Sequence, residues 1–143
     1  MTSKMTKNNG WYLLDGTVLE TPPTDAVGFV YRITRISDGK FYIGKKKLTF
    51  KRSKMVNGKK KRFTIDSDWL TYYGSSEELK NDVKSLGADS FHREILHMCN
   101  TLSQCNYLET KEIFSNNCLL REDCYNSWVS CKIHKKHVLG KVI

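Results

Sequence analysis

The chain has 143 residues, a length that suits one compact domain and leaves little room for a second. Hydrophobic residues make up 39% of it, the formal net charge is +9 and the isoelectric point is about 9.3. This composition excludes a disordered tail and favours attraction to polyanions, either nucleic acid or an anionic membrane surface.

The sequence shows no feature of a membrane-spanning or exported protein. It contains no run of about 18 or more apolar residues, so no segment is expected to cross a bilayer. Its first ten residues are polar and lack the apolar stretch of a signal peptide, which makes the cytoplasm the expected location. The five cysteines are an odd number, so we expect reduced thiols and no disulfide framework.

A group of cysteines and histidines near the C-terminus has the spacing C-x5-C-x6-C-x2-H-x2-H. It consists of Cys118, Cys124, Cys131, His134 and His137. Structural zinc sites usually combine tight pairs, and only the last part of this group is tight. Reduced, partly buried thiols are therefore the favoured interpretation, and a small zinc-stabilised interaction module is the alternative.

The first half of the chain predicts a leader followed by a β-hairpin. Residues 1–26 are punctuated by Gly and Pro and are expected to be irregular, although the apolar run 11–14 could dock onto the domain. Residues 27–36 and 40–44 are rich in β-branched and aromatic side chains, and Ser-Asp-Gly at 37–39 separates them. Asp-Gly between two such runs is a strong hairpin signal, because both residues tolerate positive φ.

Residues 45–66 are dominated by Lys and Arg. Asn57-Gly58 near their centre marks a tight turn, so we expect a basic β-ribbon or a long loop. A ribbon with this much charge is a natural element to contact phosphates, and the alternative is a solvated loop.

Two capping-box patterns predict the helices of the second half. Ser75 opens a helix that Gly87 should end, and Thr101 opens a second helix to about residue 116. Between them, residues 90–99 have the composition of a third strand.

Glu109 is the notable residue of the second predicted helix. At about 100° per residue it falls on the apolar face with Leu102, Cys105 and Ile113. A carboxylate on a buried face is costly unless it is paired, protonated or bound to metal. The simplest alternative to a metal ligand is a helix-edge Glu that pairs with a Lys or Arg.

These residues resemble the GIY-YIG nuclease family over roughly residues 27–128. Five short motifs, each weak alone, follow one another in the family's order. They are Phe29-Val30-Tyr31 for GIY with Tyr42-Ile43-Gly44 for YIG, the helix after Ser75, the strand residues 91–96, Leu108-Glu109 for the metal-binding helix, and Tyr125-Asn126 for the closing YN pair. Their order makes the resemblance specific. This sequence departs from the family where Phe29 replaces the first glycine and where residues 45–66 separate YIG from the first helix.

The resemblance implies an α+β fold with a small three-stranded antiparallel sheet flanked by helices. The implied organisation is a leader at 1–26, a nuclease domain at 27–128 with the basic insertion at 45–66, and a basic tail at 129–143.

The resemblance also implies a DNA endonuclease that hydrolyses phosphodiester bonds with one Mg²⁺ or Mn²⁺ held by Glu109. Tyr31 and Tyr42 would position or deprotonate the attacking water, and an Arg would offset charge on the phosphate. Arg52 is the first candidate because it lies ten residues after Tyr42, a common interval in the family. Since Arg52 is part of the insertion, Arg62 or Lys46 could take that role instead.

Further residues are candidates for substrate binding: Gly44, Lys45, Lys46, Lys47, Arg62, Ser75 and Asn126. Gly44 would let a phosphate approach the backbone closely. The lysines would contact phosphates or remain solvated, and Asn126 would position its neighbours.

The expected partner is DNA, with no membrane and with a homo-oligomer as one route to double-strand cutting. By resemblance, a free-standing phage-type or mobile-element enzyme, such as a homing endonuclease in the host cytoplasm, is favoured, and restriction, repair and branch cleavage stay open. Besides the zinc-stabilised module, the rival is a nucleic-acid-binding protein that keeps the fold without the chemistry.

Overall fold

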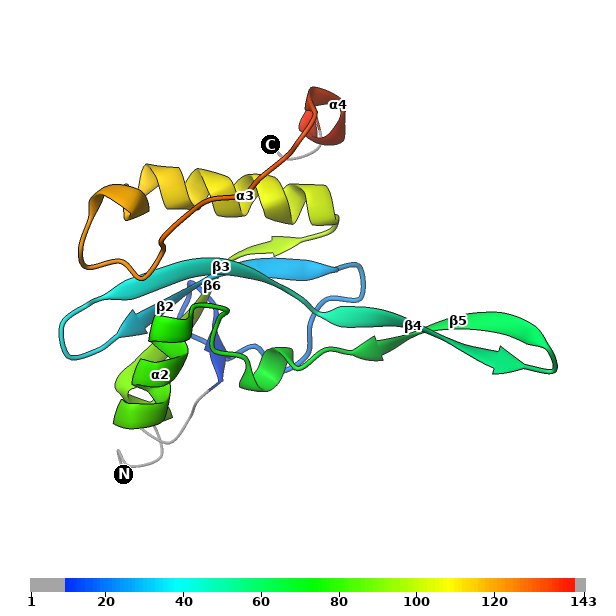
Figure 1. Ribbon diagram of the computed structural model, residues 1–143, viewed down its shortest axis with the longest axis horizontal. Coiled ribbons are helices and arrows are strands. Elements are labelled where there is room, and N and C mark those ends of the chain that lie inside the picture. Colours follow the sequence, from blue (N-terminus) through cyan, green and yellow to red (C-terminus); the bar gives the residue numbers. More distant parts are fainter. Residues whose placement is uncertain (1–9, 141–143) are drawn as a thin grey trace.

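The computed structural model describes residues 10–140, which form an α+β domain with a projecting two-stranded ribbon (Figure 1). The central sheet has the strand order β1-β6-β2-β3. Its strands are β1 (Trp11–Tyr12), β2 (Gly28–Arg35), β3 (Phe41–Lys47) and β6 (Phe91–Cys99). Helix α3 (Leu102–Ser115) covers one face, and α2 (Glu77–Leu86) packs on the other.

The expected hairpin is present as the antiparallel pair β2 and β3. The chain reverses at Ser37–Gly39, where Gly39 has a φ of +82°. The Asp38 carboxylate accepts hydrogen bonds from Arg35 Nε at 2.9 Å and from the Lys40 backbone N–H at 3.2 Å, which closes the turn. Strand β6 pairs antiparallel with the other edge of β2, as the third strand that the sequence predicts.

The sheet has a fourth strand because the leader is not entirely irregular. β1 pairs parallel with β6, and the Trp11 side chain is fully buried. Its indole Nε1–H donates to the Trp69 carbonyl at 2.6 Å, and its ring centroid lies 4.9 Å from Phe29 and 5.1 Å from Tyr31. The prediction of three strands is therefore corrected, and the docking considered for residues 11–14 is confirmed at Trp11. Residues 1–9 lie outside the described part of the chain.

Alternation along β2 divides the core into two clusters. Phe29, Tyr31 and Ile33 face α2 and pack with Trp11, whereas Val30 faces α3. The α2 side is largely aromatic. The α3 side holds four buried free thiols, those of Cys99, Cys105, Cys118 and Cys124. The expectation of burial is thus met for these four cysteines, and their reduced state stays a prediction.

The helix starts agree with the sequence to within one residue. Thr101 caps α3 as predicted, accepting a hydrogen bond from the Gln104 N–H at 3.0 Å. Helix α2 is capped by Ser76, whose hydroxyl accepts from the Leu79 N–H at 3.2 Å, so the prediction that Ser75 is the cap is wrong. Gly87 ends α2 with a φ of +93°, as expected.

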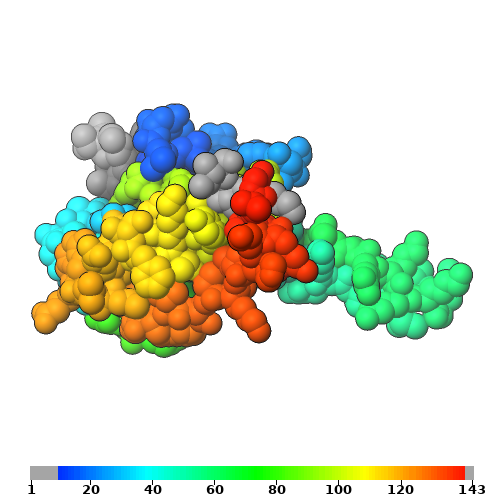
Figure 2. All heavy atoms as spheres, turned by 90° about the horizontal axis from the view of Figure 1, so that it is seen from above, coloured from blue at the N-terminus to red at the C-terminus, as the bar shows by residue number. Residues whose placement is uncertain are grey.

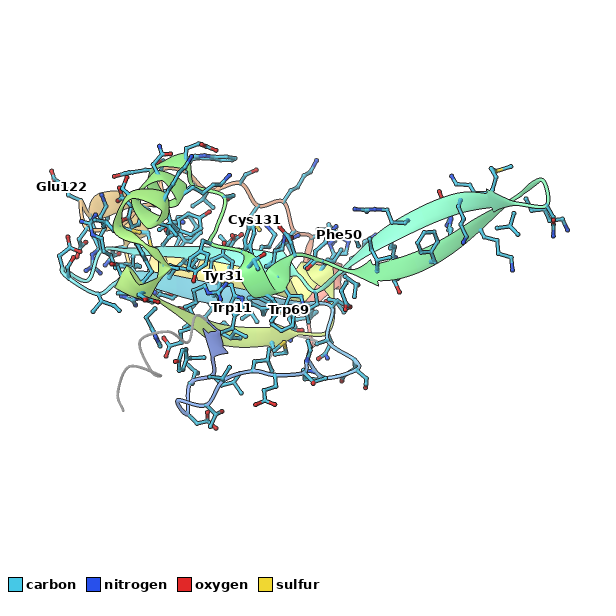
Figure 3. All side chains as sticks on the ribbon, turned by 90° about the horizontal axis from the view of Figure 1, so that it is seen from below. Trp11, Tyr31, Phe50, Trp69, Glu122 and Cys131 are labelled. Atoms are coloured by element: carbon cyan, nitrogen blue, oxygen red, sulfur yellow. The ribbon has the colours of Figure 1, made fainter. Side chains whose placement is uncertain are left out.

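The basic insertion forms a ribbon and not a loop. β4 (Thr49–Val56) and β5 (Lys59–Asp66) make a separate antiparallel sheet. Positive φ values of 52° at Asn57 and 76° at Gly58 form the tight turn between them. The ribbon extends away from the domain in all three whole-molecule views (Figures 1, 2 and 3).

The remaining helices are short: the 3-10 turns η1 (Trp69–Thr71), η2 (Ala88–Ser90) and η3 (Cys118–Leu120), and α4 (Lys135–Val138). The segment that ends in α4 crosses over α3 (Figures 1 and 2). Within residues 10–140, no helix combines the length and apolar character needed to cross a membrane.

Burial of Trp11 makes a direct prediction about stability. Trp11→Ala should lower the free energy of unfolding by about 3–5 kcal/mol, because it removes a large buried ring and leaves a cavity. Trp128→Ala is the matched control: Trp128 is 74% exposed, so its loss should change stability by less than about 0.5 kcal/mol. Urea unfolding of both variants measures the difference. Equal effects would contradict the role of β1 in the core.

Candidate active site

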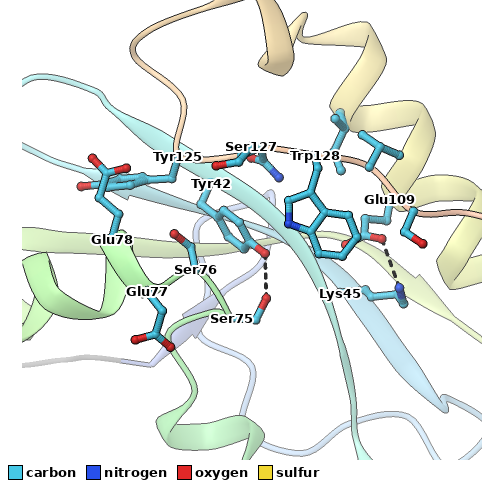
Figure 4. A pocket seen from close by; sticks show the side chains of 14 residues that line it. Tyr42, Lys45, Ser75, Ser76, Glu77, Glu78, Glu109, Tyr125, Ser127 and Trp128 are labelled. Atoms are coloured by element: carbon cyan, nitrogen blue, oxygen red, sulfur yellow. Dashed lines mark hydrogen bonds and ion pairs between the residues drawn. The ribbon is translucent and has the colours of Figure 1, made fainter.

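A pocket opens at the free edge of β3, between elements that pack on opposite faces of the sheet (Figure 4). Its wall includes Tyr42 and Lys45 from β3, Ser75 from the approach to α2, Glu109 from α3, and Asn126 and Trp128 from the segment after η3. Tyr42 and Lys45 are three residues apart on one strand, so their side chains start on opposite faces and meet at its edge.

The register of β2 and β3 places Tyr31 opposite Gly44. A Cβ atom at position 44 would lie 2.7 Å from Tyr31 Cζ and 2.9 Å from Tyr42 Cε2. Gly44 is therefore required to make room for the two tyrosine rings, whose centroids are 6.2 Å apart. The Tyr31 ring occupies the side of Gly44 where a Cβ atom would stand, so a phosphate would have to approach the backbone from another side. The approach of a phosphate to Gly44 stays a prediction.

Tyr31 belongs to the core and not to the wall of the pocket. Its side chain is fully buried, and its hydroxyl has no hydrogen-bond partner among residues 10–140. Burial raises the pKa of Tyr31 well above its usual value, and the neighbouring Tyr72 and Tyr42 raise this pKa further. The phenol is therefore neutral at physiological pH, and its ring supports Tyr42 from behind.

Tyr42 presents its hydroxyl to the pocket. That hydroxyl shares a hydrogen bond with Ser75 Oγ at 2.9 Å (Figure 4). Burial raises the pKa of Tyr42, and the hydrogen bond to Ser75 opposes part of this increase. The neutral phenol can orient a water molecule, but it can accept a proton only after a cation lowers its pKa. Because Ser76 caps α2, Ser75 is available for this contact.

Glu109 and Lys45 form an ion pair across the pocket. Lys45 Nζ donates to Glu109 Oε1 at 3.2 Å, and the Glu109 side chain is 17% exposed. The helical-wheel prediction holds for Glu109 and for the buried Cys105 and Ile113, but Leu102 is exposed. The simple alternative, a helix-edge Glu that pairs with Lys, thus describes the observed contact. The same carboxylate is nevertheless accessible from the pocket.

The next two lysines of β3 lie outside this pocket. Lys46 Nζ forms an ion pair with Asp68 at 2.5 Å and lies 4.0 Å from the centroid of the Tyr72 ring. Lys47 is exposed near the base of the ribbon. These contacts leave Lys45 as the β3 lysine closest to Glu109.

The structure does not bring Arg52 or Arg62 to the pocket. Arg52 lies on β4, where its guanidinium donates to the Lys51 carbonyl at 3.1 Å and lies 4.9 Å from the centroid of the Phe50 ring. Arg62 lies exposed on β5, opposite Ser53. The interval of ten residues from Tyr42 to Arg52 did not predict the position of Arg52, because the chain leaves the pocket after β3 and continues into the ribbon. Lys45 is the cation that lines the pocket among the described residues.

Asn126 is a structural clamp on β3. Its side-chain carbonyl accepts from the Ile43 N–H at 3.0 Å, and its amide donates to the Ile43 carbonyl at 2.8 Å. The Tyr125 N–H donates to the Phe41 carbonyl at 2.7 Å beside it. Asn126 therefore holds the edge strand in place, and its amide group is already satisfied.

Sequence reasoning missed Trp128. This residue is 74% exposed, and its ring lies over the pocket near Glu109 (Figure 4). A tryptophan between serine and valine, just after the YN pair and outside any helix or strand, was the available signal. An exposed indole beside an open pocket is a suitable contact for a ligand.

The C-terminal cysteines and histidines are not assembled as a metal site. Cys118 and Cys124 are buried, whereas Cys131 is exposed and contacts the Asn106 carbonyl. His134 and His137 cap the short α4. Within the part of the chain that the structure describes, no group of three or more His, Cys, Asp or Glu side chains is arranged to hold a metal ion. This geometry does not support the zinc-stabilised module.

Comparison with known protein families identifies the family to which the chain is similar. The family model described as "Putative endonuclease segE, GIY-YIG domain" matches residues 11–129, which include β1, the ribbon and the pocket wall except for Ser130. No curated protein and no solved structure matches the chain.

Proposed function

The chain belongs to the GIY-YIG endonuclease family, and on that premise we propose that it hydrolyses DNA phosphodiester bonds in the pocket at the β3 edge. The observation that carries this proposal is the convergence of Tyr42, Lys45 and Glu109 from two strand faces and a helix. A phenol, an ammonium group and a carboxylate around one opening supply the groups that phosphodiester hydrolysis requires.

A single Mg²⁺ or Mn²⁺ is part of the proposal, and the donors in the pocket fit such an ion. Mg²⁺ is usually held by one or two carboxylates and completes its shell with water and substrate phosphate oxygens. Glu109 offers an accessible carboxylate, whereas the Asn126 carbonyl is already used by Ile43. Glu109 would therefore be the protein ligand. When bound, the ion would stabilise charge on the phosphate and on the leaving oxygen.

The side chains of the pocket have different proposed roles in the reaction. The Tyr42 hydroxyl orients a water molecule for attack on phosphorus and accepts its proton once a nearby cation has lowered the pKa of the phenol. As the new P–O bond forms and the bond to the leaving oxygen breaks, Lys45 offsets the charge that develops on the phosphate. Tyr31 holds the Tyr42 ring from the core, and Gly44 makes that packing possible.

One pocket cuts one strand, so nicking is the proposed elementary reaction. A double-strand break then needs a second protomer or a second binding event. The rival is a nucleic-acid-binding protein with the same fold and no chemistry, for which the charge of +9 would be equally suitable. The accessible Glu109 beside Tyr42 and Lys45 favours the enzyme.

Loss of the Glu109 carboxylate tests the metal ligand. Glu109→Gln should slow Mg²⁺-dependent nicking of supercoiled plasmid by about 100-fold or more, because a charge-stabilising group is removed, while DNA binding is retained. The matched control is Glu112→Gln, one turn along α3, where the carboxylate pairs with His97 at 2.7 Å outside the pocket. An unchanged rate of nicking by Glu109→Gln would contradict the assignment of Glu109 as the metal ligand. Absence of nicking by the wild type in Mg²⁺ and Mn²⁺ would favour the non-catalytic rival.

A second comparison distinguishes the proposed role of Lys45 in the pocket from that of Arg52 on the ribbon. Under single-turnover conditions with saturating protein, Lys45→Ala should lower the nicking rate about 100-fold, because the charge that faces the phosphate is lost. Arg52→Ala should weaken binding and leave that saturated rate within about twofold. The reverse pattern, with the rate lost only in Arg52→Ala, would show that Arg52 reaches the phosphate and that the pocket is assigned wrongly.

A further inference from the structure

The β4–β5 ribbon carries most of the charge of the protein. Its two strands contain seven cationic side chains and one carboxylate, that of Asp66, so the ribbon has a formal charge of +6, whereas the whole chain has +9. The cations are Lys51, Arg52, Lys54, Lys59, Lys60, Lys61 and Arg62. In the described part of the chain, none of these seven forms an ion pair. This unneutralised charge indicates a polyanionic partner.

The apolar side chains of the ribbon are interleaved with cations. One face carries Phe50, Val56, Phe63 and Ile65 together with Arg52, Lys54, Lys59 and Lys61, and Met55 lies on the other face. The guanidinium of Arg52 lies 4.9 Å from the Phe50 ring centroid, and Lys54 Nζ lies 5.7 Å from that of Phe63. Cations therefore stand over both rings. A two-stranded ribbon of this kind is marginally stable alone in water, so an ordered partner would also stabilise it.

The base of the ribbon is fixed to the core and to the strand of the pocket. One residue, the buried Leu48, separates β3 from β4. Its N–H donates to the Val27 carbonyl at 3.0 Å, and its carbonyl accepts from the Ser67 N–H at 2.9 Å. The Ser67 hydroxyl donates to the Lys47 carbonyl at 2.6 Å. These contacts hold the start of the ribbon at a defined place relative to Lys45.

We propose that the ribbon enters the major groove of a DNA duplex on one side of the cleavage site, an inference that rests on the proposed function. The major groove of B-DNA is about 12 Å wide and admits a two-stranded β-ribbon without distortion, whereas the minor groove, about 6 Å wide, would have to be widened or bent to admit one. The cations along the strands would contact the phosphates that border the groove.

The chain geometry sets where those contacts fall. Thr49 is four residues and Val56 eleven residues after Lys45, so extended chain places them at most about 14 Å and about 40 Å away. At about 3.4 Å per base pair, the ribbon therefore reaches up to about 12 base pairs from the phosphate that faces Lys45. The enzyme therefore requires a duplex arm on that side of the cut.

Charge-neutralised variants test the ribbon. In the ribbon variant, Lys59, Lys60, Lys61 and Arg62 are each replaced by Gln. In the control, the same change is made at four exposed lysines elsewhere, Lys84, Lys111, Lys132 and Lys135. The two variants lose the same number of positive charges, so their net charges are equal. Thermal unfolding midpoints equal to that of the wild type establish that both variants are folded.

Binding to a 30-bp DNA duplex, its single strand and the RNA duplex of the same sequence is then measured. At 150 mM salt, the ribbon variant should bind the DNA duplex at least about tenfold more weakly than the wild type, and the slope of log affinity against log salt should be lower by about 3. The control variant should bind less than about threefold more weakly than the wild type. Equal loss in the two variants would overturn the proposal. So would equal affinity of the wild type for the single strand or for the RNA duplex, whose major groove is too narrow.

Modification of the DNA locates the groove. On a duplex with one mapped nick, guanine N7 methylation within about 12 base pairs on one side of the nick should reduce binding, because N7 lies in the major groove. Interference only from adenine N3 methylation, in the minor groove, would contradict the proposal. The comparison of the charge variants needs no cleavage, so an inactive protein with ribbon-dependent binding would refute the proposed function and leave the contact of the ribbon with the DNA duplex standing. An active protein with ribbon-independent binding would refute only this inference.

Discussion

The packing of the Tyr31 ring over Gly44 is the contact on which the pocket depends. With glycine at position 44, β2 and β3 can pair in this register without a clash between a Cβ atom and the two tyrosine rings. The register fixes the Tyr42 ring against Tyr31 and, one residue past Gly44, directs Lys45 to the α3 side of the sheet, where Glu109 lies. The GIY and YIG motifs thus act first as one packing unit, which places the reactive groups at the strand edge.

β3 combines three tasks because it is an edge strand. Its paired side belongs to the core, its free side opens to the pocket, and its end continues through Leu48 into the ribbon. Free strand edges tend to pair with other chains, and here Asn126 satisfies the Ile43 backbone groups at this edge. Such a clamp leaves the neighbouring side chains accessible. The proposed grip on DNA and the proposed chemistry are consequently linked by a short, firmly held piece of backbone.

The sequence predicted the elements that depend on local signals and missed those that depend on distant contacts. The Asp-Gly hairpin, the Thr101 cap and the Asn-Gly turn of the ribbon are encoded within a few residues and were predicted. β1 was missed because two residues show no periodicity, and its strand character comes from burial of Trp11 against residues far along the chain. The interval of ten residues after Tyr42 points to Arg52, but the position of Arg52 in space depends on the path of the ribbon, which is a tertiary property.

The central claim is that a divalent cation and the scissile phosphate meet at Glu109, and affinity cleavage of the protein tests it most directly. Fe²⁺ replaces Mg²⁺ on the protein bound to a 30-bp DNA duplex, and peroxide then generates radicals that break the polypeptide beside the bound ion. Backbone breaks are expected around Glu109 and along β3 near Tyr42 to Lys45, and they should be lost in Glu109→Gln. Breaks between Cys118 and His137, or a pattern that Glu109→Gln leaves unchanged, would contradict it.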